Sequence, residues 1–216
     1  VVAMVAKAAD NSTPGEWIVG RGWHQEKFDP KPEINVEGYP VHEGLSKASK
    51  LNPVMLSHAS GHAVFANKRA MDLAGINKST ADPAGGKIVR DSLGNAIGVF
   101  EENAELLISK LYDDYKDKWT DAQKRDYDRK GYLLASEECM KRGITSFYDA
   151  GSTFDEIDLL KVLVDSSLID VRLDIMLHEP NDILKKKIAD YKIKGYGKNH
   201  LTVNGMGERA GNAPLA

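Results

Sequence analysis

The sequence predicts an α/β fold: a partial (β/α)8 barrel of the TIM type that carries an inserted β-rich lobe. Three observations predict it. β-Rich runs alternate with helical segments from residue 143 onward, helical periodicity fills 101–142, and the stretch 28–100 is dense in Pro and Gly. Alternating strands and helices favour a parallel sheet with right-handed crossovers, and a barrel is the closed form of such a sheet. We therefore expect barrel segments at 1–27 and 101–216, with 28–100 forming the lobe over the barrel mouth.

Strands are expected first in the N-terminal half, after a short helical start. The apolar runs at 17–23 and 53–56 each lead into a segment containing Gly and a polar or aromatic residue. Barrel strands pass in this way into the loops that carry chemistry. Farther on, 87–99 is typical of a β-hairpin that turns at 93–95, because β-rich runs flank a Gly-Asn turn signal.

Two helices are expected between 101 and 142. Leu106, Leu107 and Leu111 lie on one helical stripe, and Thr120 can serve as the N-cap of a second helix. The inner side of that second helix is predicted to consist of Tyr127, Leu134, Ala135 and Cys139.

The half of the chain from 143 onward predicts three strands separated by two helices. In 171–177 apolar residues alternate with Arg172, Asp174 and Met176, which is the period of a strand. A helix is expected from Phe154, capped by Ser152 or Thr153. The remaining elements are strands at 144–148 and 201–203 and a helix that starts near 181.

Composition and charge exclude several classes of partner. The chain has 29 basic and 32 acidic residues and a net charge of −3, so we expect neither nucleic acid nor a membrane surface as a partner. No segment approaches the ~18 uncharged apolar residues of a membrane span. The single cysteine, Cys139, excludes an internal disulfide and suits a reducing compartment, so a cytoplasmic location is expected.

Four segments, in this order, resemble the family-3 amidohydrolases, a branch of the metal-dependent hydrolases. They are WIVGRGWH at 17–24, PVMLSHASGHAVFAN at 53–67, DPAGGKIVRD at 82–91 and GITSFYDAG at 143–151. The resemblance implies metal-assisted hydrolysis of a C–N amide or formamide bond in a small molecule, with zinc or another divalent metal as cofactor of the full-length parent. Because the chain begins without Met, we expect it to be a fragment of that parent.

The metal ligands of the resembled family have no counterpart in this chain. The family uses a His-x-His, a Lys, two further histidines and an Asp, whereas this sequence contains no His-x-His and has Gly207 near the place of the Lys. His58 and His62 have the spacing of a helical zinc pair, but Gly61 and the preceding strand argue against a helix there. We therefore expect no catalytic residue, no bound metal and no activity in this chain alone.

Five residues are candidates for substrate binding: Trp23, His24, His62, Glu102 and His178. Trp23 and His24 end a strand whose family counterpart lines the pocket, and an aromatic wall with an imidazole suits an amide. The alternative is that Trp23 is core and His24 is merely exposed. His62 lies where the family has its own Gly-His, and its ring can bind a substrate carbonyl.

Glu102 and His178 are placed by their positions after strands. Glu102 falls in a segment similar to the family's Gly-x-x-x-Glu-x-Ala; the alternative is an acidic residue favoured by a helix N-terminus. His178 ends the strand at 171–177 and is expected on the catalytic face of a barrel. Asp149 ends an earlier strand, either facing a ligand or capping the next helix.

Two other readings of the chain stay open. The first is a non-catalytic ligand-binding barrel relic that keeps the pocket and has lost the metal. The second comes from 204–213, which resembles the signature of the isopropylmalate and homocitrate synthases, although no other part of that family's pattern is present. In any of these cases the open sheet edges of a truncated barrel predict self-association.

Overall fold

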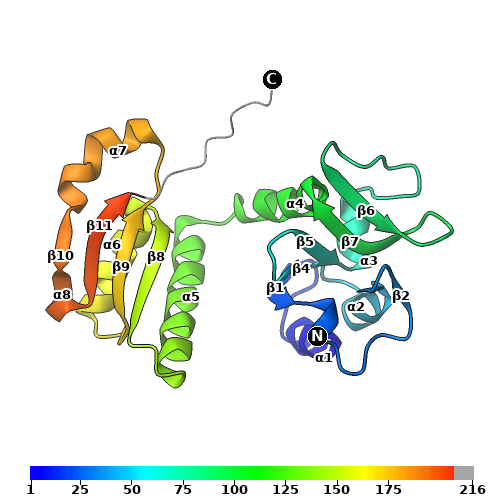
Figure 1. Cartoon of the computed structure of the whole chain (residues 1–216), viewed down its shortest axis with the longest axis horizontal. Helices are drawn as coiled ribbons and strands as arrows, with labels where there is room; N and C mark the ends of the chain where they lie inside the picture. The colour runs from blue at the N-terminus through cyan, green and yellow to red at the C-terminus, as the bar shows by residue number, and fades with distance from the viewer. Residues whose placement is uncertain (207–216) are drawn as a thin grey trace. The chain divides into compact units, whose positions relative to one another are not determined.

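The computed structural model describes residues 1–206, which fall into two compact units, Val1–Lys118 and the part from Trp119 onward. Figure 1 shows both, and each is described by itself. The predicted boundaries at 27/28 and 100/101 differ from this division, and the assignment of those segments to a barrel and a lobe stays a prediction. The synthase-like segment 204–213 lies outside the described residues from Gly207 onward.

The first unit is built on a five-stranded mixed sheet with the order β1-β4-β5-β7-β6. Only β1 and β4 are parallel; the other neighbours are antiparallel. The predicted run at 17–23 therefore shares a sheet with the strands of the predicted lobe. The strands are β1 (Ile18–Trp23), β4 (Val54–His58), β5 (Ala63–Ala66), β6 (Gly86–Arg90) and β7 (Ala96–Glu102), with a separate hairpin of β2 (Asn35–Val36) and β3 (Tyr39–Pro40).

Both faces of this first sheet are covered. Alternate residues of each strand pack into two clusters, one containing Leu56 and Phe65 and the other containing Met55 and Phe100. This alternation follows from the two-residue period of a strand. The helices of this unit are α1 (Val2–Asp10), α2 (Glu43–Ala48), α3 (Lys68–Leu73) and α4 (Leu106–Lys116), with 3-10 turns η1 (Gln25–Lys27) and η2 (Asn103–Glu105).

The predicted hairpin at 87–99 is confirmed as β6 and β7. Asp91 explains its tight turn, because the Asp91 carboxylate accepts hydrogen bonds from the backbone N–H groups of Leu93 and Asn95 at 2.9 and 2.8 Å. An aspartate that binds the backbone two residues on is a common turn former.

The second unit contains a four-stranded sheet with the order β10-β11-β9-β8. The strands β8, β9 and β11 are parallel and β10 is an antiparallel edge strand, so the predicted alternation and parallel pairing are confirmed. The strands are β8 (Ser146–Ser152), β9 (Arg172–Leu177), β10 (Ile193–Gly195) and β11 (Leu201–Met206). The helices are α5 (Asp121–Lys141), α6 (Phe154–Asp165), α7 (Asn181–Lys187) and α8 (Tyr196–Asn199), with the 3-10 turn η3 (Ile188–Tyr191).

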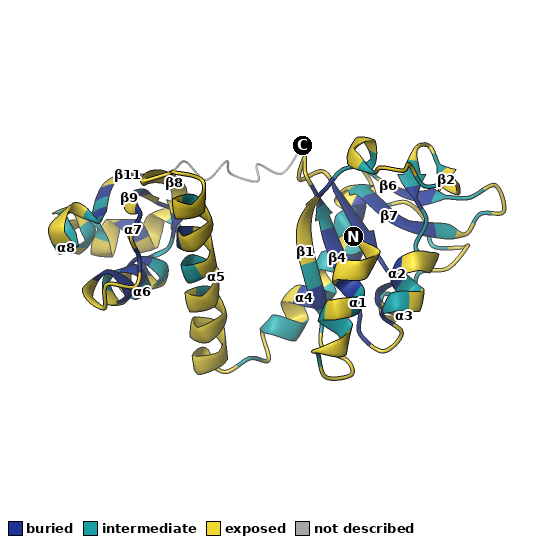
Figure 2. Cartoon of the chain, turned by 90° about the horizontal axis from the view of Figure 1, so that it is seen from below, coloured by how far each residue is buried: buried dark blue, intermediate teal, exposed yellow. Residues whose placement is uncertain are grey.

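Two helix starts agree with the sequence, whereas two helix faces do not. In α4 the buried residues are Ile108 and Tyr112, and Leu106 of the predicted stripe is 60% exposed. Thr120 and Thr153 each form a capping box, at the starts of α5 and α6. The predicted inner face of α5 is wrong for Tyr127 and Leu134, which are 47% and 66% exposed. The residue of α5 that is buried is Ser136, and Figure 2 shows α5 exposed over most of its length. This helix is largely polar, so its sequence holds no continuous apolar stripe that marks the buried side.

The second sheet buries one face. Leu173, Ile175 and Val203 belong to the core that packs with α6. The alternate residues Tyr148 and Met176, on the opposite face, are 73% and 40% exposed. Within residues 1–206 no helix combines the length and the apolar character that a membrane crossing requires.

Candidate functional site

One edge of the first sheet gathers four of the five predicted site residues. Trp23 pairs with His58 across β1 and β4, and Ala63 pairs with Glu101 across β5 and β7. The carboxyl ends of β1, β4 and β7 therefore meet the start of β5 at the same edge. We call it the histidine edge and define it by His24, His58, His62 and Glu102.

Trp23 lies beneath this edge as a core residue. Its side chain is 6% exposed, and its Nε1–H donates to the carbonyl oxygen of Leu56 at 2.8 Å. The indole meets the His58 ring edge-on, with the ring centroids 4.7 Å apart. This placement matches the alternative in which Trp23 is core, and it makes the indole a support for His58.

His24 begins the η1 turn directly after Trp23. Its Nδ1 accepts a hydrogen bond from the backbone N–H of Glu26 at 3.1 Å, so the neutral ring carries its proton on Nε2. The His24 and His58 rings lie 4.8 Å apart between centroids. His24 therefore presents a fixed N–H donor at the histidine edge.

His58 is held on both sides of its ring. The Nδ1 atom accepts from the backbone N–H of Ser60 at 3.1 Å, and Nε2 lies 3.0 Å from Oε1 of Gln25. Burial lowers the pKa of His58, and the charge that His24 can carry lowers it further. The sequence offers His58 only as a candidate zinc ligand and does not indicate Gln25, because nothing in residues 23–28 shows which distant residue Gln25 contacts.

His62 and Glu102 form an exposed pair at the same edge. Nδ1 of His62 lies 3.2 Å from Oε2 of Glu102, and the backbone N–H of Glu102 donates to the carbonyl oxygen of His62 at 3.0 Å. Their side chains are 67% and 60% exposed, so the pair stabilises the fold by at most about 1 kcal/mol. Ser60 connects the pair to His58: its Oγ lies 2.8 Å from Nδ1 of His58 and accepts from the backbone N–H of His62 at 3.2 Å.

The backbone of Glu102 is strained. Its φ of 51° belongs to a region that favours glycine and costs a non-glycine residue about 1–3 kcal/mol. The strain occurs where β7 turns into η2, next to Glu105. Burial raises the pKa of Glu105, the Glu102 charge raises it further, and His62 lowers it. Oε1 of Glu105 is buried without a hydrogen-bond partner among the described residues, and no sequence pattern indicated this residue.

His178 and Asp149 belong to the second unit. His178 follows β9, and its Nε2 is buried without a partner within residues 1–206. The Asp149 carboxylate accepts from the backbone N–H of Gly151 and from the Ser152 hydroxyl, at 3.1 and 2.8 Å. Since Thr153 caps α6, Asp149 stabilises the end of β8 and does not cap the helix.

The described residues do not fit a metal ion. No group of three or more His, Cys, Asp or Glu side chains in 1–206 is arranged to hold one. His58 and His62 share no geometry of a zinc pair, because the first ring binds Ser60 and Gln25 and the second faces Glu102. The imidazole and carboxylate groups of this edge can form hydrogen bonds and can exchange protons.

Comparison with known proteins covers nearly the whole chain. The model of the amidohydrolase family matches residues 1–207. The N-substituted formamide deformylase of Arthrobacter pascens is 32% identical over 163 residues, which are 74% of this chain and 28% of that protein. Protein LONG AFTER FAR-RED 3 of Arabidopsis thaliana is 30% identical over 151 residues, 70% of this chain and 23% of that protein. The chain thus spans about a quarter of the length of these curated relatives.

A solved structure is similar in fold. An uncharacterised metal-dependent hydrolase from Pyrococcus horikoshii aligns with a TM-score of 0.51 and 16% identity, over 95% of this chain and 36% of that one. At this identity the similarity concerns the fold alone.

Proposed function

Because the chain belongs to the amidohydrolase family, we propose that it supplies the substrate-binding part of a metal-dependent hydrolase that cleaves a C–N amide or formamide bond. The observation that carries the proposal is the histidine edge, where a fixed imidazole donor and an imidazole–carboxylate pair share one end of a sheet. The name of the Arthrobacter relative suggests N-substituted formamides as the substrate class.

In this proposal, His24 binds the carbonyl oxygen of the substrate through its Nε2–H. Trp23 holds the neighbouring His58 ring in place, and the amide of Gln25, whose oxygen already binds His58, offers a second N–H donor. Two aligned donors stabilise negative charge that develops on a carbonyl oxygen.

His62 and Glu102 are proposed to move a proton. With Nδ1 facing Glu102, the Nε2 atom of His62 is free to accept a proton from the water that attacks the carbonyl carbon. It can then pass this proton to the amine nitrogen as the C–N bond breaks. The carboxylate orients the ring and stabilises its charged form, which is the usual part of an acid behind a catalytic imidazole.

The second unit is proposed to be part of a (β/α)8 barrel. Its parallel strands have an exposed face that carries Tyr148 and Met176, as expected for strands whose barrel partners lie elsewhere. His178 ends one of these strands, and its unpartnered Nε2 supports a role in ligand binding. A divalent metal, with zinc expected, would be bound by residues outside 1–206. The location proposed for the protein is the cytoplasm.

A binding experiment tests the proposal on the chain itself. N-Benzylformamide is titrated into the protein while the imidazole resonances are followed by NMR. The His24 and His62 signals are expected to shift, and His24→Ala and His62→Ala are each expected to weaken binding about tenfold. His200→Ala, just before β11 in the second unit, is the matched control. Unchanged binding in both variants would overturn the proposal.

A further inference from the structure

A cavity of about 620 Å³ lies at the edge of the first sheet opposite the histidine edge. It is next to Ala96 and Ile97, where β7 begins, whereas Glu102 is where β7 ends. Its walls come from three segments far apart in the sequence, 34–43, 68–78 and 91–97. The volume is that of a small-molecule site, for which about 300–1,000 Å³ is usual.

The interior of the cavity is largely apolar. Met71 and Ile97, each 3% exposed, are the most buried residues of the lining. Val36, Val41, Ile76 and Ala96 complete the apolar wall. A ligand with an apolar body is therefore suited to this space.

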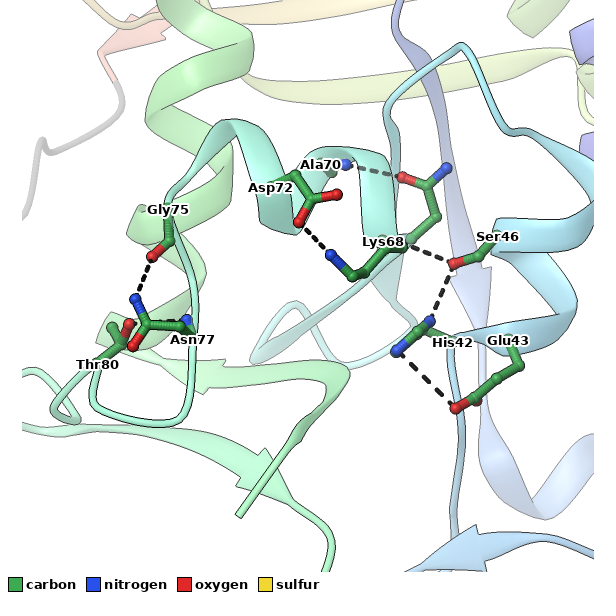
Figure 3. Close-up of polar contacts among 10 residues, drawn as sticks. His42, Glu43, Ser46, Lys68, Ala70, Asp72, Gly75, Asn77 and Thr80 are labelled. Atoms are coloured by element: carbon green, nitrogen blue, oxygen red, sulfur yellow. Dashed lines mark hydrogen bonds and ion pairs between the residues drawn. The ribbon is translucent and has the colours of Figure 1, made fainter. Parts of the chain in front are cut away.

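His42 lies on this wall, and Figure 3 shows its ring between Ser46 and Glu43. The Ser46 hydroxyl oxygen accepts from the backbone N–H of Lys68 at 2.8 Å, and the hydroxyl can donate its own proton to Nδ1 of His42, 2.9 Å away. The neutral ring then carries its proton on Nε2. The nearest acidic oxygen is Oε1 of Glu43 at 3.9 Å, too far for a hydrogen bond.

Gly98 fixes the place of His42 in the wall. A Cβ at residue 98 would lie 2.8 Å from Cβ of His42 and 2.4 Å from the carbonyl oxygen of Ala66, and φ at Gly98 is +97°. Only glycine meets both conditions. The His42 side chain, 17% exposed, is thus seated closely against β7.

Two donors near the rim can bind an anion. The Lys78 ammonium has no hydrogen bond or ion pair among residues 1–206, while Lys68 is paired with Asp72. The Asp91 carboxylate already accepts three N–H groups, two from Asn95 and one from Leu93. The pKa of Asp91 is lowered mainly by its hydrogen bonds with Asn95 and further by the charge of Lys78. The rim therefore offers two donors, Nε2–H of His42 and Nζ of Lys78, beside two acids, Glu43 and Asp91.

We propose that this cavity binds a small monocarboxylate with an apolar body. The carboxylate takes the place of Glu43 opposite Nε2 of His42 and pairs with Lys78, while the apolar body lies against Met71 and Ile97. The site shares no residue with the histidine edge, so it is independent of the proposed hydrolase function.

Calorimetry with phenylacetate and its neutral isostere 2-phenylacetamide tests the charge preference on the whole chain. Phenylacetate is expected to bind with a dissociation constant of about 1 mM, as suits a ligand of its size. The amide is expected to bind about tenfold more weakly, because it lacks the charge that Lys78 and His42 recognise. Equal binding of the two compounds, or no binding of phenylacetate, would overturn the proposal.

Variants locate the binding. Ala96→Trp fills the cavity and should abolish binding of phenylacetate, and Lys78→Ala should weaken it about tenfold. Lys185→Ala, an exposed lysine of the second unit, is the matched control and should leave binding unchanged. Circular dichroism checks that each variant folds. If Ala96→Trp does not fold, the binding of phenylacetate to Lys78→Ala tests the site. Undiminished binding in Lys78→Ala, or in a folded Ala96→Trp, refutes the site.

Discussion

The two sheets of this protein differ in how much of their surface they bury. The first sheet is mixed and packs side chains on both faces, whereas the second is mainly parallel and leaves Tyr148 and Met176 exposed on one face. Parallel sheets are normally covered on both faces. The first unit therefore covers both faces of its sheet with its own residues. The second unit has an exposed sheet face that is suited to contact with further protein.

The histidines at the strand ends differ between the units as well, although Oε1 of Glu105 in the first unit is also buried without a partner among the described residues. In the first unit His58 has both ring nitrogens in hydrogen-bond contact and His62 faces Glu102. In the second unit the described residues provide no partner for Nε2 of His178. Hydrogen bonds between side chains position the histidines of the first unit before any ligand binds. A buried nitrogen without a partner costs free energy of folding until it forms a hydrogen bond.

The strongest test of this contrast is Asn67, a fully buried helix cap of the first unit. Its amide oxygen accepts from the backbone N–H groups of Val54 and Ala70, and its nitrogen donates to the carbonyls of Ser49 and Asn52. Asn67→Ala leaves these four groups unpaired and should lower the free energy of unfolding by about 4 kcal/mol or more. Thr153→Ala, a cap of the second unit, should cost about 1 kcal/mol. Urea unfolding measures both, and equal losses would contradict the contrast.

Substitutions on the second faces of the two sheets give the next largest effect. Phe100 is 0% exposed, so Phe100→Ala should lower the free energy of unfolding by about 3–5 kcal/mol. Met176→Ala lies on the exposed face of the second sheet and should change it by less than about 0.5 kcal/mol. Hydrogen exchange, measured separately for the backbone amides of each unit, gives the loss of stability in each variant. A large loss in Met176→Ala would mean that this face is already covered.

Self-association tests whether the exposed face attracts protein. The edge strand β8 carries Tyr148, 73% exposed, next to an unpaired row of backbone groups. We expect the chain to associate as its concentration rises, and Tyr148→Lys to shift the association to higher concentration, because a charge opposes strand addition. Sedimentation velocity measures the shift. A monodisperse monomer at all concentrations would contradict the prediction.

The smallest expected effect is a pH dependence at the histidine edge. The pKa of His58 is lowered in the folded chain. Between this folded pKa and the ordinary histidine pKa of about 6.5, the unfolded chain therefore binds more protons than the folded chain. The contribution of His58 to stability is therefore complete above that pH and is lost as the pH falls toward the folded pKa. NMR titration should give a His58 pKa below 6.5, and His58→Gln should weaken the dependence of the urea midpoint on pH. A normal His58 pKa would contradict the buried, neutral ring.

Much of the fold could be predicted because it depends on neighbours in the chain. The strands around 144–148 and 171–177, the hairpin at 87–99 and the caps at Thr120 and Thr153 follow from side-chain period and turn chemistry over a few residues. The absence of His-x-His and the resemblance to the amidohydrolases were also visible in the sequence, and the family is confirmed.

Other features were decided only by the tertiary structure. The burial of Trp23, the contact of Gln25 with His58 and the pairing of His62 with Glu102 join residues that are 33 to 40 positions apart. Such contacts depend on which strands pair and in which register. Register is set by hydrogen bonds and packing across the whole sheet, which no local pattern encodes. The sequence by itself therefore determined the elements and the family, and long-range packing decided which side chains meet.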